Sequence, residues 1–296
     1  MLLQSSDRRR GGLGPTQLIA IILLLTLAGI GVYYWQQRKP GTDRPPLITA
    51  TKGFPIDEAL REATRRTGNV VFGGNPVINS SSTVTLLKNI AYHAGYCEER
   101  RNPLWVAYRL DAKEAGEKLK RPKGFKADLR TLSRVSPNDF AKTGYDRGHM
   151  APNSAIAQRF GLDAQHETFL MSNIVPQSPE LNRKVWQRLE KLEDEYANNL
   201  ETIWVITGPI FDRHIQTISN NIEIPDAFYK IIFDEEKGNL RTLAFLIQQS
   251  VTGREPIDSF LTSIDEIEKL TGLDFIAPLA DEIEDKLEAA APARIW

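Results

Sequence analysis

An uncharged, apolar run near the N-terminus divides the chain into two parts. No charged residue occurs from Gly11 to Gln37, and the stretch from Gln17 to Trp35 is almost continuously apolar. About twenty apolar residues in a helix span the hydrocarbon core of a bilayer, and aromatic residues favour its interfaces. The sequence therefore predicts one transmembrane helix over residues 17–36, after a short cytoplasmic segment, 1–16.

A cleaved signal peptide is the alternative interpretation of this run. Its apolar core would be unusually long, and no small-residue cleavage site is evident. Basic residues lie on both sides of the run, with a slight bias toward a cytoplasmic N-terminus. We therefore expect an uncleaved, single-pass anchor with the rest of the chain on the extracytoplasmic side. That side is periplasmic or extracellular in a bacterium, and the intermembrane space if the protein is mitochondrial.

After the apolar run, the sequence predicts a linker, one folded domain and a tail. Residues 37–70 are predicted as an exposed linker because their first half is rich in proline and glycine. A short, weakly periodic helix is possible within them, at 55–67. The domain is expected to span 71–280. Residues 281–296, acidic and then rich in alanine and proline, are predicted to be a peripheral tail.

The pattern of apolar residues in the domain predicts an α+β fold, a central antiparallel sheet flanked by helices. Strand-like runs alternate with segments of helical period, and the run Asp-Glu-Glu-Lys-Gly-Asn is typical of a hairpin turn. A serine followed three residues later by glutamate marks a helix start, and a glycine marks its end. The expected strands are 89–96, 105–110, 203–210, 228–233 and 240–247, and the expected helices are 184–199 and 263–272.

Charge and composition exclude some classes of protein. The formal net charge is −1, and residues 1–38 carry a surplus of three positive charges, so the remainder sums to −4. A broad basic surface that coats nucleic acid is therefore not expected. The single cysteine, Cys97, excludes an intramolecular disulfide and a cysteine-based zinc site, and no two histidines have ligand spacing.

One short motif suggests the chemistry. Residues 146–149 read Asp-Arg-Gly-His. The neutral imidazole of His149 can accept a proton near neutral pH, as the hydrolysis of a phosphodiester by water requires. A lone histidine is more often a core or surface residue, so the motif is only suggestive by itself.

Asn182 and Glu190 provide oxygen atoms that suit a hard metal. The side-chain oxygen of Asn182 is a neutral ligand of the kind Mg²⁺ accepts, although the position also fits a helix N-cap. Glu190 lies eight residues further on, about 12 Å along a helix, so the two are not expected to grip one ion directly. We expect Glu190 to act through metal-bound water or by holding an arginine or histidine. The alternative is an exposed glutamate in a charged run.

Arginines complete the candidate site. Arg147 adjoins the histidine motif and can form a charge-assisted pair with a phosphate, and Arg121 is the second candidate. Arg121 lies in a charged stretch, which is also typical of a solvated surface segment.

Together, the motifs resemble a known family. Asp146 to His149 with Pro152, the run Ser172–Gln177, and Leu181-Asn182 with Trp186 and Glu190 are similar to the DNA/RNA non-specific endonucleases. That family has a ββα-metal (His-Me finger) site, and includes mitochondrial endonuclease G and secreted bacterial nucleases. The similarity extends from about residue 72 to 275.

The resemblance implies roles for these residues. His149 would be the general base, and Asn182 the protein ligand to one Mg²⁺, with Mn²⁺ as a substitute. Glu190 would support the hydrated metal, and Arg147 would stabilise the phosphate. Arg121 would be a further catalytic arginine, and Asn173 would order the site.

The resulting hypothesis is a membrane-tethered enzyme that cuts DNA and RNA with little sequence preference and leaves 5′-phosphate ends. Two alternatives remain open: a phosphodiesterase with another substrate, and a catalytically silent, membrane-tethered domain that binds nucleic acid. A homodimer is compatible with the sequence, which contains no feature that decides the oligomeric state.

Overall fold

The computed structural model describes residues 53–79, 83–113 and 119–296. The chain divides into two units, Met1–Arg44 and Pro45–Trp296, and the first lies outside the described residues. The transmembrane helix predicted for 17–36 falls in that part. Among the residues that the structure describes, no helix has the length and apolar character needed to cross a membrane.

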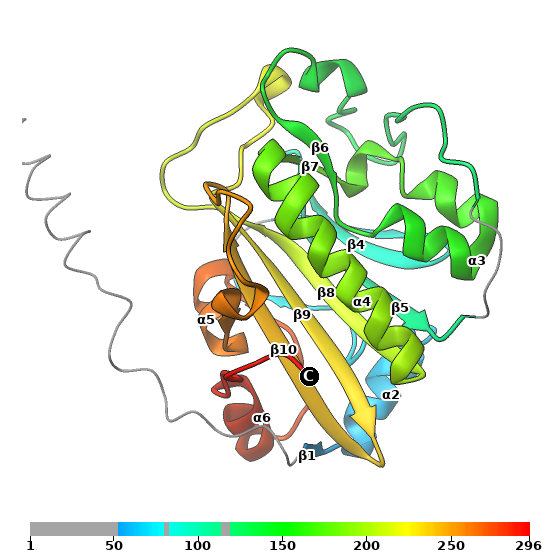
Figure 1. Ribbon diagram of the computed structural model, residues 1–296, viewed down its shortest axis with the longest axis vertical. Coiled ribbons are helices and arrows are strands. Elements are labelled where there is room, and N and C mark those ends of the chain that lie inside the picture. Colours follow the sequence, from blue (N-terminus) through cyan, green and yellow to red (C-terminus); the bar gives the residue numbers. More distant parts are fainter. Residues whose placement is uncertain (1–52, 80–82, 114–118) are drawn as a thin grey trace, which may run out of the picture. The chain divides into compact units, whose positions relative to one another are not determined.

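An antiparallel sheet of eight strands forms the centre of the second unit (Figure 1). The strand order is β1-β10-β9-β8-β5-β4-β3, and β11 pairs with β10. The strands are β1 (Phe54–Pro55), β3 (Val84–Lys88), β4 (Tyr92–Cys97), β5 (Asn102–Asp111), β8 (Thr202–Ile210), β9 (Ala227–Glu236), β10 (Asn239–Gln248) and β11 (Leu261–Thr262). All five predicted strands are present, and the α+β prediction is confirmed.

Two small ribbons and several helices surround the sheet. The ribbons pair β2 (Val77–Ile78) with β12 (Leu273–Asp274), and β6 (Asp146–His149) with β7 (Ile174–Gln177). The α-helices are α2 (Glu58–Arg66), α3 (Asn153–Glu167), α4 (Gln187–Asn199), α5 (Ile264–Thr271) and α6 (Asp281–Glu288). The short helices are the 3₁₀ turns Pro137–Phe140, Met171–Asn173, Ser219–Asn221 and Ile257–Phe260, and the π-helix Leu181–Trp186.

Helices cover both faces of the sheet, so its strands are buried on both sides. Along β9, Phe228 and Ile232 pack into one apolar cluster with residues of α3 and α4, whereas Tyr229 and Ile231 pack into another with residues of α2, α5 and α6. This alternation follows from the two-residue period of a strand. We name the two sides the α4 face and the α5 face.

The predicted linker and tail are wrong where the structure describes them. Within the linker predicted for 37–70, β1 pairs with β10, and α2 buries Leu60 completely. Within the tail predicted for 281–296, α6 buries Leu287, and Trp296 packs on the ring of Tyr196 at a centroid distance of 5.1 Å. Few apolar residues mark either segment, but Leu60 and Leu287 belong to the apolar cluster of the α5 face, and Trp296 packs against that of the α4 face.

Local signals explain several elements. The turn of the predicted hairpin contains Lys237 and Gly238 with φ of 51° and 80°, the left-handed pair that joins two twisted strands tightly. Helix α5 starts at Ser263, whose hydroxyl accepts a bond from the Glu266 amide, and ends at Gly272, with φ of 69°. Both the helix and the hairpin were predicted from the sequence.

Candidate active site

The β6–β7 ribbon carries the motif that contains His149, and the Leu181–Trp186 π-helix and α4 follow it in the chain (Figure 1). A long connection containing α3 joins the two strands. Asn173 fixes this connection: its Nδ2 donates to the carbonyls of Ala151 and Thr168, and its Oδ1 accepts from the Ala151 amide at 2.8 Å. These contacts match the ordering role expected for Asn173.

His149 is enclosed by aromatic rings at the end of β6. Only 8% of its surface is exposed, and its ring lies 5.0 Å from that of Phe169 and 5.3 Å from that of Phe125, measured between centroids. Its Nε2 is buried without a hydrogen-bond partner among the described residues. Burial, together with the positive charge of Arg121, lowers the pKa of His149 to about 3. The imidazole is therefore uncharged at neutral pH.

Arg121 lies beside both His149 and Glu190. Its guanidinium stacks over the ring of Phe169, 5.1 Å from the centroid, and that ring also contacts His149. Its charge lowers the pKa of His149 and opposes the burial that raises the pKa of Glu190. Arg121 itself is exposed. Of the two candidate arginines, it is the one whose charge is a main influence on the pKa of both groups.

Arg147 is fixed by contacts with residues 137–140 and with Phe125. Its Nε and one Nη donate to the carbonyl of Pro137, at 3.2 and 2.6 Å, and its guanidinium lies over the rings of Phe125 and Phe140. Phe125 in turn contacts His149. Arg147 thus connects the 137–140 turn with the aromatic enclosure of the histidine.

Asn182 lies in the π-helix rather than at a helix N-cap. Its backbone amide donates to the Ser178 carbonyl at 2.9 Å, and its Nδ2 donates to Asp146 at 3.0 Å. Asp146 also accepts from Arg183, whose guanidinium holds the pKa of the Asp146 carboxyl below its usual value. The N-cap alternative is therefore wrong. Because Asp146 begins the strand that ends in His149, this bond attaches Asn182 to the strand of the histidine.

Glu190 lies next to a buried ion pair. Lys230 and Glu193 are both fully buried and contact each other, and the Tyr108 hydroxyl donates to Glu193 at 2.6 Å. Burial raises the pKa of Glu190 to about 7, while Lys230 opposes this and Glu193 adds to it. Glu190 is partly buried rather than an exposed member of a charged run.

Trp186 connects this ion pair to the histidine. The Lys230 ammonium lies 4.5 Å from the centroid of the Trp186 ring, and the indole Nε1 donates to the carbonyl of His149 at 3.1 Å. No direct hydrogen bond between His149 and Asn182 is present in the described residues. The two side chains are joined through β6 and the π-helix.

Sequence reasoning missed Gln177 and Lys230. Gln177 is fully buried, and both polar atoms of its side chain lack partners in the described residues. A Cβ on Gly148 would lie 2.1 Å from the Gln177 Oε1 and 2.6 Å from its Cγ, so a larger residue there would displace the buried Gln177 side chain. Lys230 stands in the otherwise apolar run Phe228–Phe233 of β9, and a lone charge in such a run was the signal that could have revealed it.

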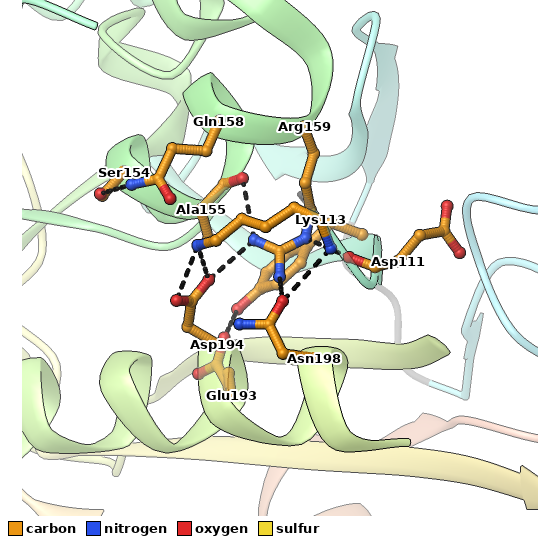
Figure 2. Close-up of polar contacts among 10 residues, drawn as sticks. Asp111, Lys113, Ser154, Ala155, Gln158, Arg159, Glu193, Asp194 and Asn198 are labelled. Carbon is orange, nitrogen blue, oxygen red and sulfur yellow. Dashed lines mark hydrogen bonds and ion pairs between the residues drawn. The ribbon is translucent and has the colours of Figure 1, made fainter. Parts of the chain in front are cut away.

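A cluster of ion pairs holds α4 against α3 (Figure 2). Asp194 accepts from Lys113 and from Arg159, the latter at 2.8 Å, and Arg159 also donates to the Asp111 carbonyl. Partial burial is the largest influence on the Asp194 carboxyl and opposes ionisation, but the bonds from Lys113 and Arg159 outweigh it and hold its pKa below the usual value. The helix that carries Glu190 is thus fixed at this end too.

The fold and this set of residues define a hydrolase of the endonuclease class, and comparisons with known proteins agree. Residues 74–282 match the family model described as DNA/RNA non-specific endonuclease. Mitochondrial endonuclease G of Bos taurus is 26% identical over 88% of this chain and 94% of its own length. The nuclease of Serratia marcescens is 29% identical over 71% and 81%. A crystal structure of the EndoG/EndoGI complex superposes with a TM-score of 0.65, at 25% identity over 73% of this chain and 93% of that chain.

The chain therefore belongs to the DNA/RNA non-specific endonuclease family. The matched residues, 74–282, cover most of the second unit. Membership makes nucleic acid the implied substrate and metal dependence the typical property, and it confirms the family resemblance of the sequence motifs.

Proposed function

We propose that this protein hydrolyses phosphodiester bonds in both DNA and RNA, with little sequence preference, and leaves 5′-phosphate ends. The observation that carries the proposal is the state of His149: an uncharged imidazole with an unpartnered, buried Nε2, beside the cationic Arg121. A proton acceptor next to a phosphate-binding cation is what this reaction needs.

The residues near His149 fit a hard divalent cation. Asp146 accepts from the Asn182 Nδ2 and so orients the carboxamide, and the Asn182 Oδ1 receives no hydrogen bond within the described part of the chain. We propose Mg²⁺, with Mn²⁺ as a substitute, held by Asn182 and supported through water by Glu190. When bound, the ion would neutralise the negative charge that develops on the phosphoryl group and on the leaving 3′ oxygen.

His149 acts as the general base in this proposal. It takes the proton of the attacking water, and its aromatic enclosure keeps it uncharged beforehand. Burial is the main reason that the pKa of His149 is low, and the positive charge of Arg121 lowers it further. An anionic phosphate bound by Arg121 would offset the second of these influences and raise the basicity of the imidazole to that extent.

We assign the exposed Arg121 to the scissile phosphate and keep Arg147 as the second cation. Arg147 already donates twice to Pro137, so its position is fixed before substrate arrives. Contacts to phosphates carry no base information, which accounts for a low sequence preference.

The test uses the detergent-solubilised full chain with plasmid DNA and with RNA, in Mg²⁺ or in EDTA. We expect cutting of both polymers that needs the metal and is lost in His149→Ala. His214→Ala, an exposed histidine, is the matched control and should cut normally. Retention of DNA without cutting would support the silent binding domain. Hydrolysis of a small phosphodiester, without cutting of either polymer, would support the alternative of a phosphodiesterase with another substrate.

We further propose that the chain is anchored by residues 17–36, with the catalytic domain outside the cytoplasm. A nuclease with little sequence preference would endanger its own genome in the cytosol, and the apolar run offers an anchor. The protein should stay in membranes washed with alkaline carbonate and leave only with detergent. Release by carbonate would contradict the anchor.

A further inference from the structure

Three carboxylates meet between α5 and α6, on the α5 face. Asp265 and Glu268 are three residues apart on α5 and so share one side of that helix, and Glu288 is the last residue of α6. One carboxylate oxygen from each lies within 4.8 Å of the others. We name these residues the acidic triad.

The buried member of the triad has an unsatisfied oxygen. Glu288 is 6% exposed, and its Oε1 has no hydrogen-bond partner among the described residues. An oxygen of Glu284 and one of Asp274 are in the same state. A buried, unpaired carboxylate oxygen costs several kcal/mol in general, so native proteins usually supply a partner.

The charged groups that act on the triad's two glutamates are all acidic. Burial is the main reason that the pKa of Glu268 rises to about 7 and that of Glu288 to about 9. The remaining upward influence comes from other carboxyls: each glutamate is raised by Asp265, Asp274 and Glu284, and Glu288 also by Glu268. Among the described residues, no cation is one of the main influences on either glutamate.

The ligands that the triad offers suit Ca²⁺. Its three carboxylate oxygens lie within 4.8 Å of one another, close enough to share one hard divalent cation, and proteins bind Ca²⁺ through several carboxylates whereas they usually bind Mg²⁺ through only one or two. Ca²⁺ also tolerates irregular geometry and fills its shell with water. Asp265 is exposed, which leaves a route for the ion and its waters.

We propose that the acidic triad binds one Ca²⁺ ion, separate from the metal at the active site. The ion bridges α5 and α6 and anchors the end of α6 to the domain. Its ligands belong to the α5 face, where none of the proposed catalytic residues lies. The expected role is therefore stability rather than phosphodiester hydrolysis.

The test keeps the active site out of the measurement. Asn182→Ala is introduced into the full chain to remove the proposed Mg²⁺ ligand, and the protein is stripped with EDTA. Calorimetric titration should give one Ca²⁺ per chain. At a hundredfold excess over Kd, Ca²⁺ should raise Tm by about 5 °C, from the stabilisation expected for ligand binding and the size of the domain. An absent rise, or an equal rise with Mg²⁺, would overturn the proposal.

Substitutions separate binding at the triad from adventitious binding elsewhere. In the same background, Glu268→Gln with Glu288→Gln should weaken Ca²⁺ binding by tenfold or more and abolish the Tm rise. In EDTA at a pH above 9, where both glutamates are ionised, the same variant should melt above its parent, because two like charges are gone. Glu282→Gln, exposed on the same helix, is the matched control and should keep the full response. If the double variant is poorly folded, Glu268→Gln alone is used. Full Ca²⁺ binding in a folded triad variant contradicts the assignment.

Discussion

Two clusters of acidic side chains, on opposite faces of the sheet, have different charged neighbours. On the α4 face, Glu193 contacts Lys230, and Asp194 contacts Lys113 and Arg159. On the α5 face, the acidic triad has carboxyls as its charged neighbours. At Asp194, cations outweigh partial burial and hold the pKa below its usual value, whereas at Glu288 burial and then the neighbouring carboxyls raise the pKa to about 9. At these two sites, the presence of a cation beside the partly buried carboxyl decides whether its ionised form stabilises the fold.

The largest expected effect concerns the chemistry of the α4 face. His149→Ala should lower the rate of DNA cutting by about 10²–10⁴-fold, the usual contribution of a general base, and excess Mg²⁺ should not restore it. Asn182→Ala should also lose activity but recover part of it at high Mg²⁺, because the remaining groups can still hold a weakly bound ion. Cleavage rates measured against Mg²⁺ concentration separate the two, and equal rescue of both would refute the distinct roles.

Lys230→Met should be the most damaging change to stability. It leaves Glu193 charged and buried, which typically costs about 3–5 kcal/mol. Urea denaturation of Lys230→Met and of the double variant with Glu193→Gln measures this. The double variant should recover much of the loss, and an additive loss would show that the pair is not coupled.

Asp194→Asn should cost about 1–2 kcal/mol at pH 7, since it removes charged hydrogen bonds that are partly exposed. The sign of the pH dependence follows from the lowered pKa. The native carboxylate contributes its stability above the pKa of the unfolded state and loses it as the pH falls through the lower, folded pKa. The difference in unfolding free energy between the two proteins should therefore be full at pH 7 and should shrink as the pH falls below about 4, as denaturation curves at both pH values would show. A constant difference would contradict the ion-pair explanation.

The smallest effect is expected at Cys97, which belongs to neither group of acids. The thiol is buried and donates to Glu99, and burial raises its pKa to about 11. Cys97→Ser should cut DNA at the normal rate, and iodoacetamide should label the native thiol slowly at pH 7.5. A large loss of cutting would reveal a role for this residue.

The strands, the hairpin and α5 could be predicted because local signals determine them. Alternating apolar residues, a turn with a glycine and a serine cap each act within a few positions of the chain. The linker and the tail were mispredicted because residues such as Leu60 and Leu287 gain their burial only from strands far away in the sequence.

The candidate site divides in the same way. The motif around His149 could be identified as a candidate from the sequence, and so could Asn182 and Glu190, because their spacing and side-chain chemistry are local features. The buried neighbours could not: Lys230 contacts Glu193 only because β9 passes beneath α4. The aromatic enclosure is also non-local, since Phe125 and Phe169 come from different segments.

The π-helix at Leu181–Trp186 determines the directions in which side chains point before and after it. A π-helical turn accommodates one residue more than an α-helical turn, and each residue of an α-helix rotates the chain by about 100°. Deleting a single residue there would let a regular α-helix continue. With Glu190 kept in place, the deletion would rotate Asn182 about the helix axis by about 100°, and so away from Asp146. The additional residue of the π-helix thus lets Asn182 reach Asp146 while Glu190, on the same helix, keeps its own position. A regular α-helix of one residue less would lose this arrangement.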